Sequence, residues 1–132
     1  MPEAEELLGK SERTFEDARK ALKQEMLVST IQNRIYYSIF YAAQAALISR
    51  GEDTGSHAGV KIRLGEKLIK KGELDREWGR FFSQQQTYRE QADYQVDVDI
   101  EREELEEYLE DAEEFIRKMK EVVKGQNGRG AI

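Results

Sequence analysis

The stretch NRIYYSIFYAAQAALISR, residues 33 to 50, decides the fold of this chain. On a helical wheel of about 100° per residue, its apolar side chains cover nearly the whole circumference. A helix with this pattern is packed on several sides, whereas a surface helix keeps one polar face. The stretch therefore predicts a central helix, from about residue 29 to residue 50, with Gly51 as its C-cap.

Helix signals before and after this stretch predict the rest of the architecture. Pro2 and the acidic residues after it are typical of a helix start, because proline suits the first turn and carboxylates suit the positive end of the helix dipole. Apolar residues then recur at three- and four-residue steps as far as Lys23. Ser56 is a suitable N-cap for a shorter helix that ends at Gly72, and Asp75 opens another long one.

The last helix has the cleanest amphipathic stripe in the chain, and Asp99 is its predicted N-cap. Residues 93 to 100 alternate briefly, but a lone strand would have no partner, so we interpret them as an ordered loop. We predict an all-α fold, an up-and-down antiparallel helical bundle of four long helices plus one shorter helix. We expect residues 1–124 to form a single domain and residues 125–132 a flexible C-terminal tail.

Composition excludes several classes of function. The chain has 132 residues, the length of one domain, and a formal net charge of -6. It contains no cysteine, so thiolate zinc sites, iron–sulfur clusters and cysteine nucleophiles are excluded. The net negative charge argues against sequence-independent coating of nucleic acid. A chain with this net charge can still carry local basic patches. No leader opens the chain and no apolar run reaches the roughly 18 residues that cross a bilayer, so we expect a cytoplasmic protein.

Arg34 stands out because it precedes a run of aromatic residues on the predicted central helix. On the wheel it falls close to Tyr37 and Tyr41, where an unpaired buried guanidinium would be too costly. Two interpretations stay open. Arg34 either reaches solvent or a structural salt bridge while its methylenes cover the tyrosines, or it lines an anion-binding cleft together with Asn33.

Arg89 repeats this pattern on the next long helix. It lies on the same face as Trp78, Phe82 and Gln85, so its side chain points inward or into a cleft. Two inward-facing arginines from two helices suggest an anion site. Asp93, four residues later, offers the alternative of a structural ion pair within the helix.

Other polar residues give less specific signals. His57 is the only histidine, and its place at a helix start favours a capping or surface role over acid–base chemistry. Asp93, Asp97 and Asp99 lack the spacing and the glycine of a calcium loop, and no glycine-rich phosphate loop appears, so we expect neither metal nor cofactor. A basic run on the third helix is typical of a solvated face but would also suit RNA or an acidic partner. It consists of Lys61, Arg63, Lys67, Lys70 and Lys71.

Three motifs in order resemble the HEPN domain family: NRIYYSIFYAAQAAL on the second helix, SHAGV at the start of the third and REQADY at the end of the fourth. The resemblance covers residues 3 to 124, and its most specific pieces are Arg34-Ile35-Tyr36-Tyr37 and Arg89 with Ala92, Asp93 and Tyr94. It implies a helical bundle, commonly a symmetric homodimer, found in prokaryotes beside small nucleotidyltransferases in toxin–antitoxin pairs. It also implies nucleotide or RNA binding, and many members are metal-independent ribonucleases.

In those ribonucleases a histidine follows the arginine by four to six residues, and the two act on the phosphate and the ribose 2′-hydroxyl. Arg89 matches the arginine, but Tyr94 stands where the histidine is expected. A phenol with a pKa of about 10 is a poor base at neutral pH. The resemblance therefore favours binding over cleavage in this chain.

We interpret the chain as a HEPN-like module that binds nucleotide or RNA phosphate, as a homodimer, with a small nucleotidyltransferase as its protein partner. A metal-independent endoribonuclease remains an alternative, with Arg89, Tyr94 and His57 as its catalytic candidates. A structural dimer or scaffold without ligand is a third hypothesis. The predicted binding residues are Asn33, Arg34, Tyr37, Arg89, Asp93 and Tyr94.

Overall fold

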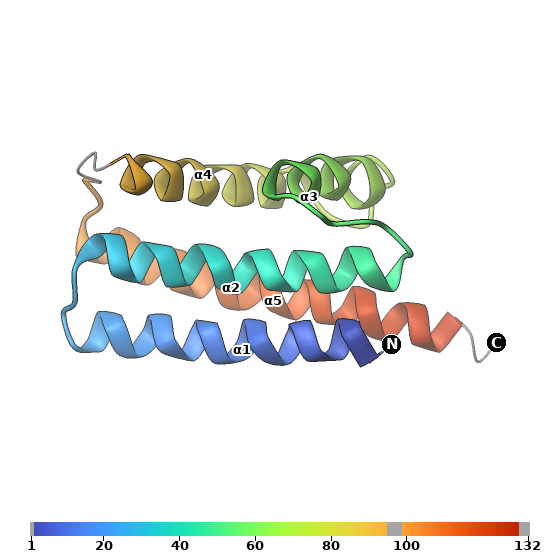
Figure 1. Cartoon of the computed structure of the whole chain (residues 1–132), viewed down its shortest axis with the longest axis horizontal. Coiled ribbons are helices and arrows are strands. Elements are labelled where there is room, and N and C mark those ends of the chain that lie inside the picture. The colour runs from blue at the N-terminus through green and yellow to red at the C-terminus, as the bar shows by residue number, and fades with distance from the viewer. Residues whose placement is uncertain (1, 95–98, 130–132) are drawn as a thin grey trace.

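The structure, a computed structural model, is helical in all its regular elements over the residues that it describes, 2–94 and 99–129. The long helices are α1 (Pro2–Lys23), α2 (Val28–Ser49), α4 (Arg76–Asp93) and α5 (Arg102–Arg129). The short helix α3 (His57–Leu64) continues into a π-helical segment, η1 (Gly65–Ile69). The long helices run up and down along one axis (Figure 1), which confirms the predicted bundle of four long helices and one shorter helix.

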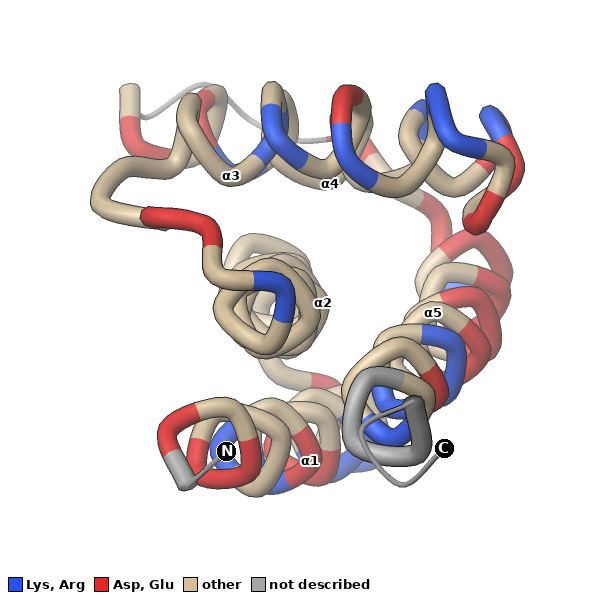
Figure 2. Tube along the Cα trace, turned by 90° about the vertical axis from the view of Figure 1, so that its right-hand side faces the viewer, with Lys and Arg blue, Asp and Glu red and all other residues tan. Residues whose placement is uncertain are grey.

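Helix α2 is the central element, as predicted. Seen along its axis, α1 lies beneath it, α3 and α4 lie above it and α5 lies to one side (Figure 2). Between Ile31 and Ser49, all residues of α2 are buried except six half-buried ones. These six recur at three- and four-residue steps along one side of the helix, and we call them the open side of α2. They are Asn33, Arg34, Tyr37, Tyr41, Gln44 and Ile48.

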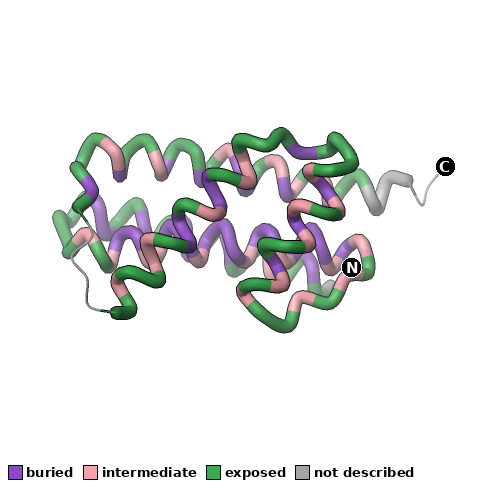
Figure 3. Tube along the Cα trace, turned by 90° about the horizontal axis from the view of Figure 1, so that it is seen from above, coloured by how far each residue is buried: buried purple, intermediate pink, exposed green. Residues whose placement is uncertain are grey.

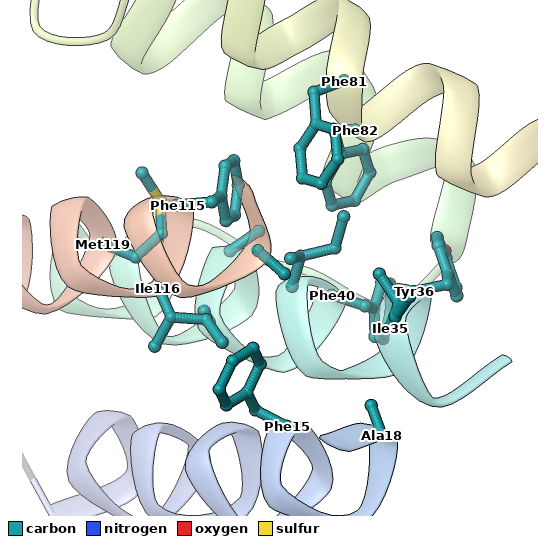
Figure 4. Packing of buried hydrophobic residues seen from close by; sticks show 14 of the residues in the cluster. Phe15, Ala18, Ile35, Tyr36, Phe40, Phe81, Phe82, Phe115, Ile116 and Met119 are labelled. Carbon is teal, nitrogen blue, oxygen red and sulfur yellow. The ribbon is translucent and has the colours of Figure 1, made fainter. Parts of the chain in front are cut away.

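The core lies between α2 and the helices around it. Phe82 of α4 and Phe115 of α5 are fully buried with ring centroids 6.0 Å apart, and Phe15 reaches toward them from α1 (Figure 4). Exposed residues follow the outer faces of the helices (Figure 3). Gln32 joins α2 to α4 through buried polar contacts, since its Nε2 donates to the backbone carbonyl of Gln85 at 2.8 Å and to Gln85 Oε1 at 3.4 Å.

The ends of α2 and α3 follow the sequence signals. Ser56 Oγ accepts a hydrogen bond from the backbone N–H of Gly59 at 2.9 Å, which confirms the predicted N-cap of α3. Gly51 follows α2 with a φ of 79°, a left-handed conformation that glycine adopts at little cost. The π-helical segment η1 is a feature that we did not predict, because one wider turn leaves little mark on hydrophobic periodicity.

The start of α5 differs from the prediction. The helix begins at Arg102, so Asp99 is not its N-cap. Instead, Glu104 Oε1 accepts a hydrogen bond from the backbone N–H of Glu101 at 3.4 Å, one of the two reciprocal contacts of a capping box. The local signal was present in the sequence, but Asp99, two residues before Glu101, matched the cap preference better.

The end of α5 also extends further than the sequence suggests. The backbone stays helical through Arg129, so the expected tail boundary at Gly125 falls inside the helix. Residues 95–98, which include Asp97 and half of the expected loop, lie outside the described residues. No helix in the described part of the chain combines the length and the apolar character needed to span a bilayer.

Candidate functional site

Arg89 lies one turn before the end of α4 and reaches onto α2. Its Nη1 donates a hydrogen bond to Tyr37 Oη at 3.1 Å and forms an ion pair with Asp93 Oδ2 at 3.4 Å. The guanidinium carbon lies 5.4 Å from the ring centroid of Tyr36 and 6.0 Å from that of Tyr37, within the range of cation–π attraction. Only 19% of the Arg89 side chain is exposed, so α2 holds this cation against the bundle.

Arg34 approaches the same tyrosine from its own helix. Its guanidinium carbon is 5.6 Å from the ring centroid of Tyr37. Its Nε and Nη2 donate hydrogen bonds to Asn33 Oδ1 at 3.0 and 2.7 Å. Within residues 2–94 and 99–129, no carboxylate forms an ion pair with Arg34. The structural salt bridge that sequence analysis left open is therefore absent from this part of the chain, and a neutral amide takes its place.

Of the two guanidiniums, that of Arg89 is the one with an ion-paired carboxylate among the described residues. This carboxylate, Asp93, is 56% exposed and forms the predicted ion pair within α4. Arg89 Nε is buried and has no hydrogen-bond partner among the described residues. Burial acts to lower the pKa of Arg89, but the hydrogen bond with Tyr37 and the charge of Asp93 outweigh it and raise the pKa. Arg89 is therefore a cation whose hydrogen-bonding capacity the protein leaves partly unused.

The fold brings His57, the first residue of α3, into this group. Its Nδ1 lies 2.7 Å from Tyr36 Oη, in a hydrogen bond between α3 and α2. The imidazole stacks on Phe40, with ring centroids 4.3 Å apart and planes inclined by 16°. Burial, and then the charge of Arg89, lower the pKa of His57 below its ordinary value, so the ring is neutral at physiological pH. Instead of a capping or surface residue, His57 is a half-buried neighbour of the arginine.

We call Arg34, Tyr36, Tyr37, His57 and Arg89 the Arg89 cluster. Helix α2 supplies its base, α4 supplies Arg89, and the start of α3 supplies His57. Figure 1 shows that α3 lies over only one part of α2, so the first half of α2 and the last turns of α4 meet beyond the start of α3. Except for the fully buried Tyr36, the members of the cluster are half-buried and within reach of a ligand.

The structure does not bring Tyr94 into the cluster. This residue is the C-cap of α4, and its side chain is 82% exposed. Its backbone N–H donates to the carbonyls of Glu90 and Gln91 at 3.3 and 3.2 Å, while its hydroxyl bonds to no group in the described part of the chain. Tyr94 is close to Arg89 in sequence, but successive residues of a helix point in directions about 100° apart.

Sequence analysis named Tyr36 only within the HEPN motif, and it placed neither Tyr36 nor Phe40 among the site residues. Both lie in the buried stripe of α2, where an aromatic residue is ordinary core. One signal could have identified Tyr36, because a buried tyrosine needs a hydrogen-bond partner for its hydroxyl. The single histidine of the chain is a natural partner, although its place next to Tyr36 depends on how α3 packs.

A family model described as the HEPN domain matches residues 4–122 of the chain. The chain belongs to the HEPN domain family. The matched range runs from α1 to α5 and includes every member of the Arg89 cluster. The three motifs of this HEPN chain fall on α2, at the start of α3 and at the end of α4, where the sequence resemblance places them.

Several relatives are similar over most of their length. A "UPF0332 protein" of Thermotoga maritima is 31% identical over 109 residues, which cover 83% of this chain and 82% of the relative. A protein of Methanocaldococcus jannaschii with the name "Putative toxin MJ0142" is 31% identical over 131 residues, or 95% of this chain and 88% of the relative. A second protein of that organism, "Putative toxin MJ0605", is 32% identical over 107 residues, or 81% and 79%.

Proposed function

We propose that this HEPN chain is a module of the toxin–antitoxin type that binds a phosphate group of a nucleotide or RNA at the Arg89 cluster. The observation that carries this proposal is the charge imbalance around Tyr37. Two guanidiniums lie within 6.0 Å of its ring, and Asp93 is the one described carboxylate paired with either of them. A phosphate would supply the missing negative charge and accept from the unused donors.

The aromatic surroundings suit the rest of such a ligand. Tyr37 and Tyr41 lie next to each other on the open side of α2, with ring centroids 5.8 Å apart, and both are half-buried. A base that stacks on one of these rings would leave its phosphate within reach of Arg34 and Arg89. Asn33 takes part by orienting Arg34 through its amide oxygen. Asp93 limits the local positive charge, and Tyr94 remains an exposed residue at the edge of the site.

The chain acts, in this proposal, as a homodimer beside a small nucleotidyltransferase in the cytoplasm. The open side of α2 supports the dimer, because a second copy seated on it would cover Tyr41 and Ile48 and bring two Arg89 clusters into one cleft. Sedimentation should show a dimer that Ile48→Asp weakens. Ile62→Asp is the matched control, since Ile62 is an apolar residue of α3 that is already 57% exposed. Equal dimerisation in both variants would place the interface elsewhere.

Metal-independent RNA cleavage is a second candidate, favoured by the position of His57 beside Arg89. Such cleavage needs a group that accepts the proton of the ribose 2′-hydroxyl, and His57 is the one imidazole in the chain. An RNA cleavage assay in the presence of a chelator tests it. Activity that disappears in both Arg89→Ala and His57→Gln would support cleavage, and activity that survives in Arg89→Ala would exclude it.

The phosphate site is tested by calorimetric titration of Mg-ATP, Mg-GTP and a short single-stranded RNA into the wild-type protein and Arg89→Ala. Arg80→Ala is the control, because Arg80 is an exposed arginine on the same helix. Saturable binding that is lost in Arg89→Ala and kept in Arg80→Ala is the expected result. Absence of binding by all ligands would favour the scaffold hypothesis, in which Arg89→Ala lowers only the melting temperature.

A further inference from the structure

The hydrogen bond between Tyr36 and His57 determines what His57 can do for a ligand. Tyr36 is fully buried, and the partner of its hydroxyl is His57 Nδ1 at 2.7 Å. In a neutral imidazole one nitrogen carries the proton and donates, while the other accepts. Because Nδ1 is used in the bond with Tyr36, the direction of this bond decides whether the other nitrogen, Nε2, carries the proton.

Tyr36 is the better donor in this pair. Burial raises the pKa of its hydroxyl above the ordinary value, so the group keeps its proton. If His57 Nδ1–H donated instead, the hydroxyl hydrogen of Tyr36 would be left without an acceptor in a buried place, which is unfavourable. The guanidinium of Arg89, 5.4 Å from the centre of the Tyr36 ring, attracts electron density and strengthens the hydroxyl as a donor.

Packing keeps the imidazole in this orientation. Its plane is inclined by 19° to the ring of Tyr36 and by 16° to the ring of Phe40, while Tyr37 meets it edge-on at 84°. A 180° flip of the ring would keep the stacking but would put Cδ2 in the place of Nδ1 and break the hydrogen bond with Tyr36. His57 Nε2 has no hydrogen-bond partner among residues 2–94 and 99–129, and it is the nitrogen left for a ligand.

We propose that Tyr36 fixes His57 in the tautomer with the proton on Nε2, so that His57 is a neutral hydrogen-bond donor to the phosphate oxygen held by Arg89 and Arg34. This inference rests on the proposed phosphate site. In it, His57 touches the ligand, whereas Tyr36 is a positioning residue that acts through His57. The ligand class is a phosphate monoester or diester, whose unbridged oxygens accept hydrogen bonds and donate none.

A neutral donor suits this place better than a third cation. The charge of Arg89 disfavours a second positive charge on the imidazole, while Asp93 and Glu90, both on α4, act in the opposite direction. With the proton on Nε2, His57 adds a hydrogen bond to the site and no repulsion. The same tautomer leaves no lone pair on Nε2 to accept the proton of a ribose 2′-hydroxyl, so this proposal and the cleavage candidate exclude each other. In this tautomer His57 contributes equally to the binding of RNA and DNA phosphates.

The first test is the tautomer itself, measured on the unmodified protein. Since His57 is the only histidine, the long-range ¹H–¹⁵N spectrum of histidine-labelled protein contains one imidazole. At about pH 8, where that ring is neutral, we expect the pattern of an Nε2–H tautomer with Nδ1 as a hydrogen-bond acceptor. In Tyr36→Phe, the Nδ1 resonance should move toward that of an unbonded nitrogen. An Nδ1–H pattern in the wild-type protein would overturn the proposal.

The second test is binding of adenosine monophosphate to two substitutions of the same histidine. The amide nitrogen of glutamine occupies the place of Nε2, and that of asparagine the place of Nδ1. We expect His57→Gln to bind adenosine monophosphate within about twofold of the wild-type affinity. His57→Asn should bind it about tenfold more weakly, because one hydrogen bond to a charged group is lost. Equal affinities in both variants would show that His57 does not touch the phosphate.

These tests separate the two proposals. If Arg89→Ala leaves binding unchanged, the phosphate site is wrong, whatever the tautomer of His57. If Arg89→Ala abolishes binding while His57→Gln and His57→Asn bind as wild type, the phosphate site stands and the role of His57 is wrong. Deoxyadenosine and adenosine monophosphates should bind with equal affinity, and a preference for the ribose that disappears in His57→Gln would contradict the donor role.

Discussion

Arg50 and Arg89 are buried to nearly the same extent, yet their charges are satisfied in different ways. Their side chains are 17% and 19% exposed. Arg50 Nη1 and Nη2 donate to the two carboxylate oxygens of Glu73 at 2.8 and 2.9 Å. Arg89 has a tyrosine hydroxyl at 3.1 Å and one oxygen of Asp93 at 3.4 Å. Arg50 therefore has a bidentate carboxylate partner, while Arg89 does not.

The difference shows that the partner of a buried arginine, more than its burial, indicates its role. The hydrogen bond with Glu73 is the main cause that raises the pKa of Arg50, so this pair is already well formed without a ligand. An anion that approached Arg50 would have to displace a carboxylate held by two bonds. An anion at Arg89 would meet a more exposed carboxylate with one contact, and it would gain Arg34 as well.

The largest effect should follow the removal of Arg89. Arg89→Ala is expected to cost about 2 to 5 kcal/mol of phosphate-binding free energy, because it leaves the anion without its main charged partner. Calorimetry with Mg-ATP measures this loss, and circular dichroism checks that the variant is folded. If the variant bound normally but unfolded more easily, Arg89 would be a structural arginine like Arg50.

The reverse result is expected for Arg50. Arg50→Ala should lower the free energy of unfolding by about 1.5 to 3 kcal/mol, because it removes two charge-assisted hydrogen bonds from a largely buried pair. Urea denaturation measures this change, and Glu73→Gln should lower the stability in the same direction. Phosphate binding should stay at the wild-type level in both variants. Weaker binding in Arg50→Ala would mean that the two arginines are coupled.

Asp93 should have a smaller effect, of the opposite sign. Asp93→Asn removes the carboxylate that competes with a ligand for Arg89, so phosphate should bind more tightly by about 0.2 to 1 kcal/mol, the range measured for exposed ion pairs. Titrations at low and high salt would show the gain shrinking as salt screens it. Weaker binding in Asp93→Asn would instead show that Asp93 orients the guanidinium.

The smallest effect concerns the pH dependence of stability, which distinguishes the surroundings of Arg89 from those of Arg50. Burial and Arg89 lower the pKa of His57 in the folded chain below its ordinary value of 6.5, so the unfolded chain binds the proton more readily. The stability due to neutral His57 is therefore complete above pH 6.5 and is lost as the pH falls through the folded pKa. Urea denaturation from neutral to acid pH should show a steeper loss in the wild-type protein than in His57→Gln.

Hydrophobic periodicity was sufficient to predict the fold, because the stripes of α1, α2, α4 and α5 are long and each needs a partner. The exact start of α5 was not predictable in the same way, since Asp99 and Glu101 both stand before a run of acidic residues and the helix begins directly after Glu101. The π-helical segment η1 packs on α4, where Ile69 lies against Gly79, and this contact between distant residues leaves no local signal in the sequence.

In the candidate site, too, the residues with a local sequence signal were predictable and the contacts between distant segments were not. Arg34 and Arg89 could be chosen from the sequence because an arginine on an apolar helix face is a local anomaly. The bond between Tyr36 and His57 joins residues that are 21 positions apart on different helices, so the periodicity of a single helix cannot predict it. Tyr94 is the opposite case, because it is close to Arg89 in sequence while its side chain lies exposed outside the Arg89 cluster.

The pair of Arg50 and Glu73 also joins the two ends of the segment that leaves α2, forms α3 and η1, and returns to α4. A second ion pair between Lys67 and Glu52, at 3.3 Å, lies within this segment. We expect the amide hydrogens of α3 and η1 to exchange with solvent through one shared opening, at a lower free energy than that of global unfolding. Such an opening would carry His57 away from the site while Arg89 stays on α4, so the two sides of the Arg89 cluster belong to parts of the chain that open separately.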